Sequence, residues 1–340
     1  MKLCIRAPNW VGDVVMATPV IGAALRTPRF ASVTVVVREH LAGILEDGPA
    51  AQHVRTLARH DQESDLYRAL APDAVMILSN SFGAAWRARA AGIGVRAGSA
   101  LGGRRFLLTH AVIPPARGGR RVPIPSAHLM RDVAGLVGVL VPDLHPVLGV
   151  REEVVERERA RLGRLGLRDG EGYVLCCPGA AFGAAKLWPP ERFAQALDRL
   201  RALHGWRAVV TGGPGEEDLV DAVATHALGD AISLAAEVRD LAGLKALVAG
   251  ARLLLVGDSG PRWFAAAFDV PCVSVMGPNF PELTASSLEL AAIVRVEDLE
   301  CAPCLERVCP LRHHRCMREV TVDRVIEATR DVLARKAAVA

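Results

Sequence analysis

Short runs of β-branched and other apolar residues alternate along this chain with amphipathic segments. The runs that indicate strands are Lys2–Ala7, Val33–Val37, Ala74–Leu78, Tyr173–Cys177, Ala208–Thr211, Leu253–Val256 and Cys272–Met276. The segments that indicate helices are Thr18–Leu25, Glu191–Leu203, Glu217–Thr225, Leu241–Ala249 and Arg262–Phe268. Alternation of this kind is typical of βαβ units, so the sequence predicts an α/β fold with parallel sheets and helices on both faces.

The chain is long enough for two domains, and its character changes near the middle. Its 340 residues exceed one ordinary core, because domains hold about 150 residues each. Two prolines interrupt Val141–Leu148, and the charged stretch Arg151–Arg164 follows, so we expect the junction here. We predict α/β domains at 1–150 and 151–320 that face each other across a cleft. An amphipathic helix within 321–340 is expected to pack back on the first domain.

Composition excludes several protein classes. The chain is 51% hydrophobic and 23% charged, with a mean hydropathy of +0.24, which excludes a disordered or collagen-like protein. No apolar stretch approaches the roughly 18 residues that span a bilayer. The N-terminus, MKLCIRAPNWVGD, reaches polar and charged residues too early for a signal peptide. We therefore expect a cytoplasmic protein.

One segment of the first half is strongly basic. From Ala74 to Arg131 there is no Asp or Glu, although the net charge of the whole chain is only +4. The arginines of this segment are Arg87, Arg89, Arg96, Arg104, Arg105, Arg117, Arg120, Arg121 and Arg131. Such a segment indicates an anionic partner, such as a phosphorylated lipid or a membrane surface; the alternative is a solvated basic face. An aromatic content of 4% and the lack of an RNA- or DNA-binding motif argue against nucleic acid.

Ligands of open parallel sheets bind at the carboxyl ends of strands, so the loops that follow strands hold the candidate residues. The first loop contains Gly12 and Asp13, and Pro19 is expected at the first position of the next helix. A carboxylate in this loop can take a proton from a substrate hydroxyl. Capping of a helix explains Asp13 equally well, and both interpretations stay open.

The second loop runs from Cys177 to Pro190 and holds one of only four lysines, Lys186. Small residues let backbone N–H groups approach phosphate oxygens, and an ammonium group balances their charge. The spacing is not that of a P-loop. The loop is therefore a candidate phosphate site, with a plain surface lysine as the alternative.

Two further loops follow strands in the second half. The loop 211–218, TGGPGEED, lacks the spacing of a dinucleotide fingerprint, and its carboxylates can accept hydrogen bonds from a ribose or a base amine. The loop 257–262, GDSGPR, contains Ser259, a good N-cap residue, at the start of a helix whose N–H groups favour a diphosphate. Together the loops predict a nucleotide-diphosphate ligand in the second domain, with Asp13 contributed by the first.

These loops resemble those of the ADP-heptose:lipopolysaccharide heptosyltransferases, glycosyltransferase family 9, most of all the heptosyltransferase II group. The matching motifs are NWVGD-x4-TP, PGA-x-FG-x-AK-x-WP, DSGPR and FDVPCVSVMGPN, which occur in family order over nearly the whole chain. The resemblance implies a GT-B fold of two Rossmann-like domains, with the nucleotide sugar bound by the C-terminal one. It also implies inverting transfer of L-glycero-D-manno-heptose from ADP-heptose to inner-core lipopolysaccharide, with no metal or other cofactor needed for catalysis.

The resemblance also assigns roles to single residues. Asp13 matches the family's general base, and Lys186 matches the lysine that contacts the donor diphosphate and stabilises the departing ADP. Glu216 corresponds to an acid near the nucleoside. The residues expected at the donor site are Gly12, Lys186, Glu216, Asp258, Ser259, Gly260 and Trp263. The arginines expected to contact an anionic inner-core acceptor at the membrane are Arg104, Arg105, Arg117, Arg120 and Arg121.

Two features of the sequence leave alternatives open. Family members usually carry His where this chain has Trp263, and an indole N–H is bulkier than imidazole and never charged. The alternatives to a heptosyltransferase are an enzyme that uses another nucleotide sugar and a catalytically impaired nucleotide-binding homologue.

The cysteines Cys301, Cys304, Cys309 and Cys316 form a C-x2-C-x4-C-x6-C cluster. Such a cluster can bind zinc, with His313 and His314 as substitute ligands, or hold free thiols or disulfides.

Overall fold

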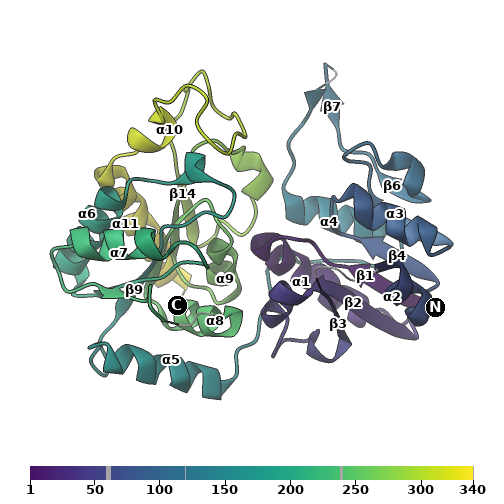
Figure 1. The fold of residues 1–340 in the computed structure, drawn as a ribbon, viewed down its shortest axis with the longest axis horizontal. Helices are drawn as coiled ribbons and strands as arrows, with labels where there is room; N and C mark the ends of the chain where they lie inside the picture. The colour runs from purple at the N-terminus through teal and green to yellow at the C-terminus, as the bar shows by residue number, and fades with distance from the viewer. Residues whose placement is uncertain (59–62, 119, 238–239, 340) are drawn as a thin grey trace. The chain divides into compact units, whose positions relative to one another are not determined.

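Two compact units make up the chain (Figure 1). The computed structural model describes residues 1–58, 63–118, 120–237 and 240–339. The first unit holds Met1–Gly149 with the short segment Glu282–Ser286, and the second holds Val150–Pro281 with Ser287–Ala340. We call them the first and second domains.

The first domain is built on a parallel sheet of six strands. Their order across the sheet is β3 (Val54–Leu57), β2 (Ser32–Arg38), β1 (Lys2–Arg6), β4 (Ala74–Ile77), β5 (Val95–Ser99) and β6 (His110–Val112). The helices are α1 (Val11–Leu25), α2 (Glu63–Leu70), α3 (Phe82–Ala90) and α4 (Ser126–Gly135). A short antiparallel hairpin of β7 (Ala116–Arg117) and β8 (Arg120–Arg121) projects from this domain (Figure 1).

The second domain repeats the same strand order. Its sheet runs β11 (Ile232–Ser233), β10 (Arg207–Val210), β9 (Tyr173–Cys177), β12 (Leu253–Gly257), β13 (Cys272–Val275) and β14 (Ala291–Val294). Its helices are α5 (Glu152–Arg164), α6 (Pro190–His204), α7 (Glu217–His226), α8 (Leu241–Gly250), α9 (Pro261–Ala267), α10 (Arg315–Arg318) and α11 (Val322–Val339). All paired strands in both sheets are parallel, which confirms the predicted α/β class.

Central strands are apolar along their whole length because helices cover both faces of each sheet. Every residue of β4, β9 and β12 is buried. In the second domain the core includes Trp188 and Phe193, whose rings meet edge to face with centroids 4.9 Å apart. The indole N–H of Trp188 donates to the carbonyl oxygen of Val320 at 3.1 Å, so the core also holds the chain that leads into α11.

Two elements differ from the sequence prediction, whereas the C-terminal helix is present as predicted. The charged stretch 151–164, which marked the expected domain junction and was not predicted as a helix, forms helix α5 and packs on α8. Helix α1 begins at Val11, so the predicted start at Thr18, with Pro19 at the first position, is wrong. The C-terminal helix is present as α11 and packs on α6, β13 and β14 of the second domain. Its packing on the first domain stays a prediction.

Proline in the interior of α1 removes the N–H that would bond to the carbonyl oxygen of Val15. The hydroxyl of Thr18 donates to that oxygen instead, at 2.7 Å. The same hydroxyl accepts a hydrogen bond from the N–H of Val147 at 2.9 Å. The helix therefore continues through Pro19 without an unpaired carbonyl group, which explains why a start signal in the sequence lies inside the element.

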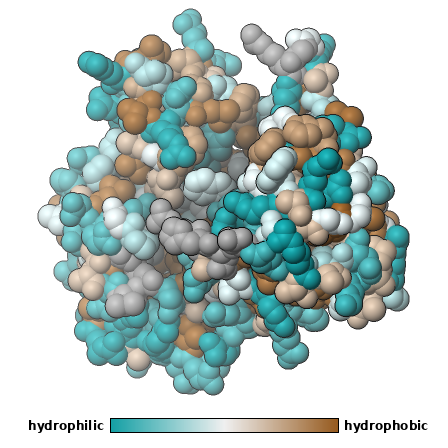
Figure 2. Space-filling view, turned by 45° about the vertical axis from the view of Figure 1, so that its right-hand side comes forward, coloured by the Kyte–Doolittle hydropathy of each residue, from teal (hydrophilic) through white to brown (hydrophobic). Residues whose placement is uncertain are grey.

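No helix in the described part of the chain is both long and apolar enough to span a membrane. On the face drawn in Figure 2, hydrophobic side chains are interspersed with hydrophilic ones.

Candidate functional site

Each sheet has one point where the direction of chain progression reverses. In the first domain this point lies between β1 and β4, and in the second it lies between β9 and β12. The connections that leave these neighbouring strands turn to opposite faces, which opens a crevice at the carboxyl edge. Asp13 follows β1, Lys186 follows β9 and Asp258 follows β12. The sequence motifs thus lie at both switch points.

An ion pair joins two of the predicted residues at the second switch point. Lys186 Nζ lies 2.6 Å from Asp258 Oδ2, and their side chains are only 12% and 9% exposed. The ring of Phe182 lies under the ammonium group, 4.8 Å from ring centroid to Nζ. Because both groups are largely removed from water, each charge depends on the other for compensation. The pair holds an ammonium group at the edge where a diphosphate is expected.

Asn279 completes this cluster and was not singled out from the sequence. Its Nδ2 donates to Asp258 Oδ2 at 3.0 Å, and its Oδ1 accepts from the N–H of Phe280 at 2.9 Å. It follows β13, the strand beside β12. The signal available in the sequence was the MGPN motif directly after a predicted strand.

Glu216 lies against the backbone of the loop that follows β9. A Cβ atom built on Gly179 would come within 2.0 Å of Glu216 Oε2, so in this conformation the carboxylate occupies the space that a side chain at position 179 would need. The same oxygen accepts a hydrogen bond from the N–H of Gly213 at 2.7 Å. Two of the predicted loops are therefore in direct contact at the carboxyl edge of the second sheet.

The loop after β12 differs in detail from its prediction. Gly260, rather than Ser259, occupies the N-cap position of α9, and no side chain caps this helix. Ser259 instead lies in a tight turn, in which its N–H bonds to the carbonyl oxygen of Gly257 at 2.8 Å. The N-cap role predicted for Ser259 is therefore wrong. The cause is Pro261, which takes the first helical position, where its fixed φ angle suits the helix start.

Trp263 lies in the first turn of α9 and is buried, with only 4% exposure. The guanidinium carbon of Arg262 lies 4.4 Å from the centroid of its ring. A charged group over an aromatic face is a favourable arrangement, worth about 0.5–2 kcal/mol. The indole is thus part of the packing at the start of α9.

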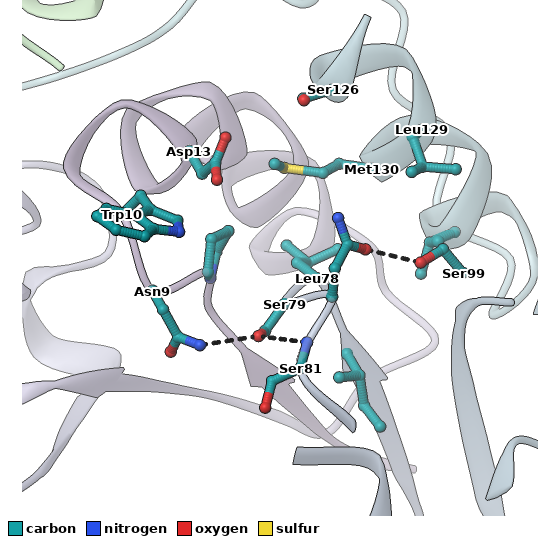
Figure 3. A pocket seen from close by; sticks show the side chains of 14 residues that line it. Asn9, Trp10, Asp13, Leu78, Ser79, Ser81, Ser99, Ser126, Leu129 and Met130 are labelled. Atoms are coloured by element: carbon teal, nitrogen blue, oxygen red, sulfur yellow. Dashed lines mark hydrogen bonds between the residues drawn. The ribbon is translucent and has the colours of Figure 1, made fainter. Parts of the chain in front are cut away.

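The first switch point holds a pocket of about 280 Å³ (Figure 3). Asn9 and Trp10 line it from the loop after β1, and Asp13 lines it from α1. The other polar lining residues come from the ends of β4 and β5 and from α4: Ser79, Asn80, Ser81, Ser99 and Ser126. Leu129 and Met130 close it with apolar surface. Serine and asparagine side chains around a partly apolar floor suit a polyhydroxylated ligand such as a saccharide.

Asp13 was predicted to lie in a loop, but the structure places it in the first turn of α1. The N-cap position belongs to Trp10, so Asp13 is not the cap residue of this helix. Figure 3 shows its carboxylate directed toward the pocket between Trp10 and Met130. Gly12 is buried in the same turn and does not line the pocket. Of the two sequence-based alternatives, the N-cap is excluded, and the role as a base stays a prediction.

A buried polar network supports the pocket from below. Arg6 Nε contacts Glu63 Oε1 at 2.8 Å, with both side chains at most 2% exposed. Arg6 also donates from Nη2 to Asn9 Oδ1 at 2.8 Å. Since a guanidinium only donates, this contact fixes which end of the Asn9 amide faces Ser79. Asn9 Nδ2 then donates to Ser79 Oγ at 3.1 Å and links the loops after β1 and β4.

The family model described as glycosyltransferase family 9 (heptosyltransferase) matches residues 66–315. The chain belongs to this family. The match covers most of both domains and includes Lys186, Glu216 and Asp258.

Two curated relatives of this family 9 chain are lipooligosaccharide heptosyltransferases 2. The Haemophilus ducreyi protein is 24% identical over 98% of this chain and 100% of its own length. The Campylobacter jejuni protein is 30% identical over 49% of this chain, and the match spans only 53% of that relative. Among the relatives, therefore, the stronger local similarity is confined to about half of either protein.

Solved structures of family 9 share the fold. The glycosyl transferase family 9 structure from Veillonella parvula superposes with a TM-score of 0.81 at 20% identity, covering 98% of this chain and 97% of that one. The Escherichia coli heptosyltransferase WaaC, solved with ADP-2-deoxy-2-fluoro heptose, has a TM-score of 0.67 at 18% identity and covers 97% and 99%. At these identities the likeness concerns the fold alone, and it agrees with the predicted GT-B arrangement of two Rossmann-like domains.

The arginines of the basic segment have different environments. Arg105, Arg117 and Arg121 are exposed, whereas the side chain of Arg120 lies outside the described residues. Arg104 is 0% exposed, and burial lowers its pKa to about 10. The expectation that Arg104 touches an acceptor directly is therefore wrong, because its guanidinium group lies in the protein interior.

The four cysteines of the C-terminal cluster are free thiols. Cys301 Sγ lies 3.9 Å from His313 Nε2. Burial raises the pKa of Cys316 to about 11, with further increases from the charges of Cys304, Cys309 and Cys301. Within the ranges that the structure describes, no three His, Cys, Asp or Glu side chains are arranged to hold a metal ion.

Proposed function

We propose that this chain is an inverting glycosyltransferase of the heptosyltransferase II type. It moves L-glycero-D-manno-heptose from ADP-heptose to the inner core of lipopolysaccharide. The observation that carries the proposal is the Lys186–Asp258 pair at the switch point of the second sheet, in a chain that belongs to family 9. The second domain binds the donor, and the first domain binds the acceptor.

The donor site uses Lys186 to stabilise the departing diphosphate. When the bond from the anomeric carbon to the diphosphate oxygen breaks, its electron pair passes to ADP. A preorganised ammonium group at the edge of the sheet stabilises that charge and makes a metal ion unnecessary. Asp258 and Asn279 hold the ammonium group in place. Glu216 accepts hydrogen bonds from the nucleoside, and the WaaC structure with an ADP-heptose analogue supports a donor of this class.

The acceptor site uses Asp13 as the general base. The acceptor hydroxyl oxygen attacks the anomeric carbon from the face opposite ADP, and Asp13 takes the proton of that hydroxyl. A carboxylate at the rim of a pocket lined with serine and asparagine is suited to this step, because the neighbouring groups hydrogen-bond to sugar hydroxyls. Inversion at the anomeric carbon follows from a single displacement.

An exposed aromatic cluster of the first domain contributes contact with the cytoplasmic face of the inner membrane. Phe82, Trp86 and Phe106 are 46%, 53% and 64% exposed, and the rings of Phe82 and Phe106 lie 6.1 Å apart. Arg89 and Arg105 are exposed and lie close to Trp86 and Phe106 in the sequence, within the acid-free segment. Aromatic side chains beside arginines favour an anionic lipid surface. Sedimentation with vesicles containing phosphatidylglycerol tests this contact, and Trp86→Ser with Phe106→Ser should reduce it.

Mass spectrometry decides the proposed reaction. The protein is incubated with ADP-heptose and a mono-heptosylated inner-core acceptor, and a mass gain of one heptose is expected. UDP-glucose and ADP-glucose serve as competing donors. Transfer from one of these donors, but not from ADP-heptose, would assign the chain to another nucleotide sugar. Normal ADP binding without transfer from any donor would contradict the enzymatic proposal. Trp263, which stands where family members usually carry His, would then be the first residue to test as the cause of the lost activity.

A further inference from the structure

Arg104 is a buried cation with unusual partners. Its Nε donates to the carbonyl oxygen of Ser99 at 2.9 Å, and its Nη1 donates to the carbonyl oxygens of Ser79 and Ser81. No carboxylate among the described residues pairs with it. A buried guanidinium without a counter-ion is costly, and backbone carbonyl groups offset only part of that cost. The positive charge is held directly behind the inner wall of the pocket in the first domain.

A chain of hydrogen bonds connects the Arg104 guanidinium group to Asn80, which lines the pocket. Arg104 Nη2 donates to Ser99 Oγ at 2.9 Å, and Ser99 Oγ donates to Asn80 Oδ1 at 2.7 Å. If the Asn80 amide were turned round, the buried hydroxyl hydrogen of Ser99 would lose its acceptor, which is unfavourable. Asn80 therefore keeps its oxygen toward Ser99 and leaves its NH₂ group as the donor available to a ligand.

Ser79 has its hydrogen-bond polarity fixed in the same way from the other side. Its Oγ accepts from Asn9 Nδ2 at 3.1 Å and from the N–H of Ser81 at 3.2 Å. Both lone pairs of the hydroxyl are thereby used, so its hydrogen is left to donate. In the described part of the chain no acceptor is in contact with that hydrogen. Ser79 and Asn80 thus face the pocket as donors only.

We infer that Ser79 and Asn80 form a donor wall for an anionic oxygen group of the acceptor, a carboxylate or a phosphate. Such groups only accept hydrogen bonds, so they match a wall that only donates, and the charge of Arg104 favours them further. Asp13 lines the pocket from α1, and Ser79 and Asn80 line it from the loop after β4, so the base and the anion-binding groups come from different elements. The inference rests on the proposed function, because it places the acceptor in this pocket.

Asn80→Asp tests the donor wall, because it replaces the exposed amide with a carboxylate of nearly the same shape. Calorimetry without donor measures binding of the mono-heptosylated inner-core oligosaccharide to the wild-type chain and to the variant. We expect the affinity to fall about tenfold or more, since a charge-assisted hydrogen bond is lost and a repulsion is gained. Gln52→Glu adds the same charge at an exposed site of the first domain outside the pocket and should leave the affinity unchanged. Thermal unfolding of each variant verifies that it is folded.

Two treated oligosaccharides identify the group that is bound. In one the phosphates are removed by a phosphatase, and in the other the carboxylates are reduced to alcohols. The difference in affinity between the wild-type chain and Asn80→Asp should shrink to less than about threefold for one of the two treated oligosaccharides. The group removed from that oligosaccharide is then the anion that binds the donor wall. The inference would be overturned if the affinity difference between wild type and Asn80→Asp were the same for both treated oligosaccharides. It would also be overturned if Asn80→Asp did not change the affinity for the untreated oligosaccharide. If the oligosaccharide binds through Ser79 and Asn80 but no heptose is transferred to it, the proposed function is contradicted and the inference is not.

Discussion

The contact between Gly179 and Glu216 illustrates how single residues fix the candidate donor site. A methyl group at position 179 would overlap the Glu216 carboxylate, and at position 212 it would approach Glu216 Cβ within 3.0 Å. Both glycines permit the close approach of Glu216, and neither has a left-handed backbone. The two loops therefore constrain each other, and the acid near the proposed nucleoside site has little freedom to move.

Lys186→Ala should weaken ADP binding by about 1–3 kcal/mol, because a charge-assisted contact with the diphosphate is lost. Calorimetry with ADP measures the effect. Lys336→Ala removes the same charge from the surface helix α11 and should not change the affinity. Unchanged ADP affinity in Lys186→Ala would remove this lysine from the donor site.

Asp13→Asn should lower kcat by about 10²–10⁴-fold and leave acceptor binding nearly unchanged, since the amide keeps the shape of the side chain but cannot take the proton. Steady-state kinetics at saturating acceptor measure the change. Asp65→Asn, at an exposed position of α2, is the matched control and should retain wild-type kcat. Wild-type turnover in Asp13→Asn would show that the proposed mechanism is wrong.

At the scale of elements, helix α1 depends on the hydroxyl of Thr18. Thr18→Val leaves the carbonyl group of Val15 and the N–H of Val147 without partners, so unfolding should become easier by about 1–3 kcal/mol. Thr329→Val is the matched control, because the hydroxyl of Thr329 donates to the carbonyl oxygen of Val325, which regular helix bonding already satisfies. Urea unfolding compares the two variants. Equal losses of stability would contradict the role assigned to Thr18.

The cysteine segment gives a pH-dependent prediction. Because the thiolate is the reactive form, a pKa of about 11 leaves little reactive Cys316 at neutral pH. Its alkylation rate should rise about tenfold per pH unit between pH 8 and 10. The half-buried thiols of Cys301, Cys304 and Cys309 should react first. Mass spectrometry of iodoacetamide-treated protein follows each site, and rapid pH-independent labelling of Cys316 would contradict the assignment.

At the scale of the whole molecule, the proposal separates acceptor and donor binding between two domains. Arg121→Glu, on the β7–β8 hairpin, should therefore impair use of an anionic acceptor and leave ADP affinity intact. Arg55→Glu makes the same change on β3, at the opposite edge of the first sheet from β6, and should affect neither ligand. Acceptor kinetics and ADP calorimetry measure both. If Arg121→Glu impaired both the use of the acceptor and the affinity for ADP, the variant would be misfolded or the two ligands would share a site.

The sequence predicted the centre of each sheet better than its edges. Central strands such as β9 and β12 are buried throughout and form continuous apolar runs, so they were found. Edge strands were missed because little of their surface is buried or because they are short: β3 exposes two of its four residues, and β11 has two residues. Short polar connections and the charged α5 have no apolar signature comparable to that of a buried strand.

For the candidate sites, the motifs placed Lys186 and Asp258 after strands of the second sheet, as the structure has them, whereas Asp13 lies in the first turn of α1 and not in the predicted loop. The donor wall was not found, because Ser79 and Asn80 are oriented by Asn9, Ser99 and Arg104, which lie far from them in the sequence and which only the fold brings together. Burial of Arg104 was missed for the same reason. A basic run in a sequence carries no information about which of its members points inward.

Helix α11 has a consequence for the order of events during synthesis. Its Val325, Ile326 and Val332 are at most 1% exposed and belong to the same core as Val273 and Val275 of β13. Residues 1–149 make up nearly all of the first domain, which can therefore begin to fold while the second domain is still being translated. The second domain must wait until α11 emerges, and until then the nascent chain exposes an apolar face. Chaperone contacts with the growing chain should therefore concentrate on ribosome-bound intermediates that end between β14 and α11.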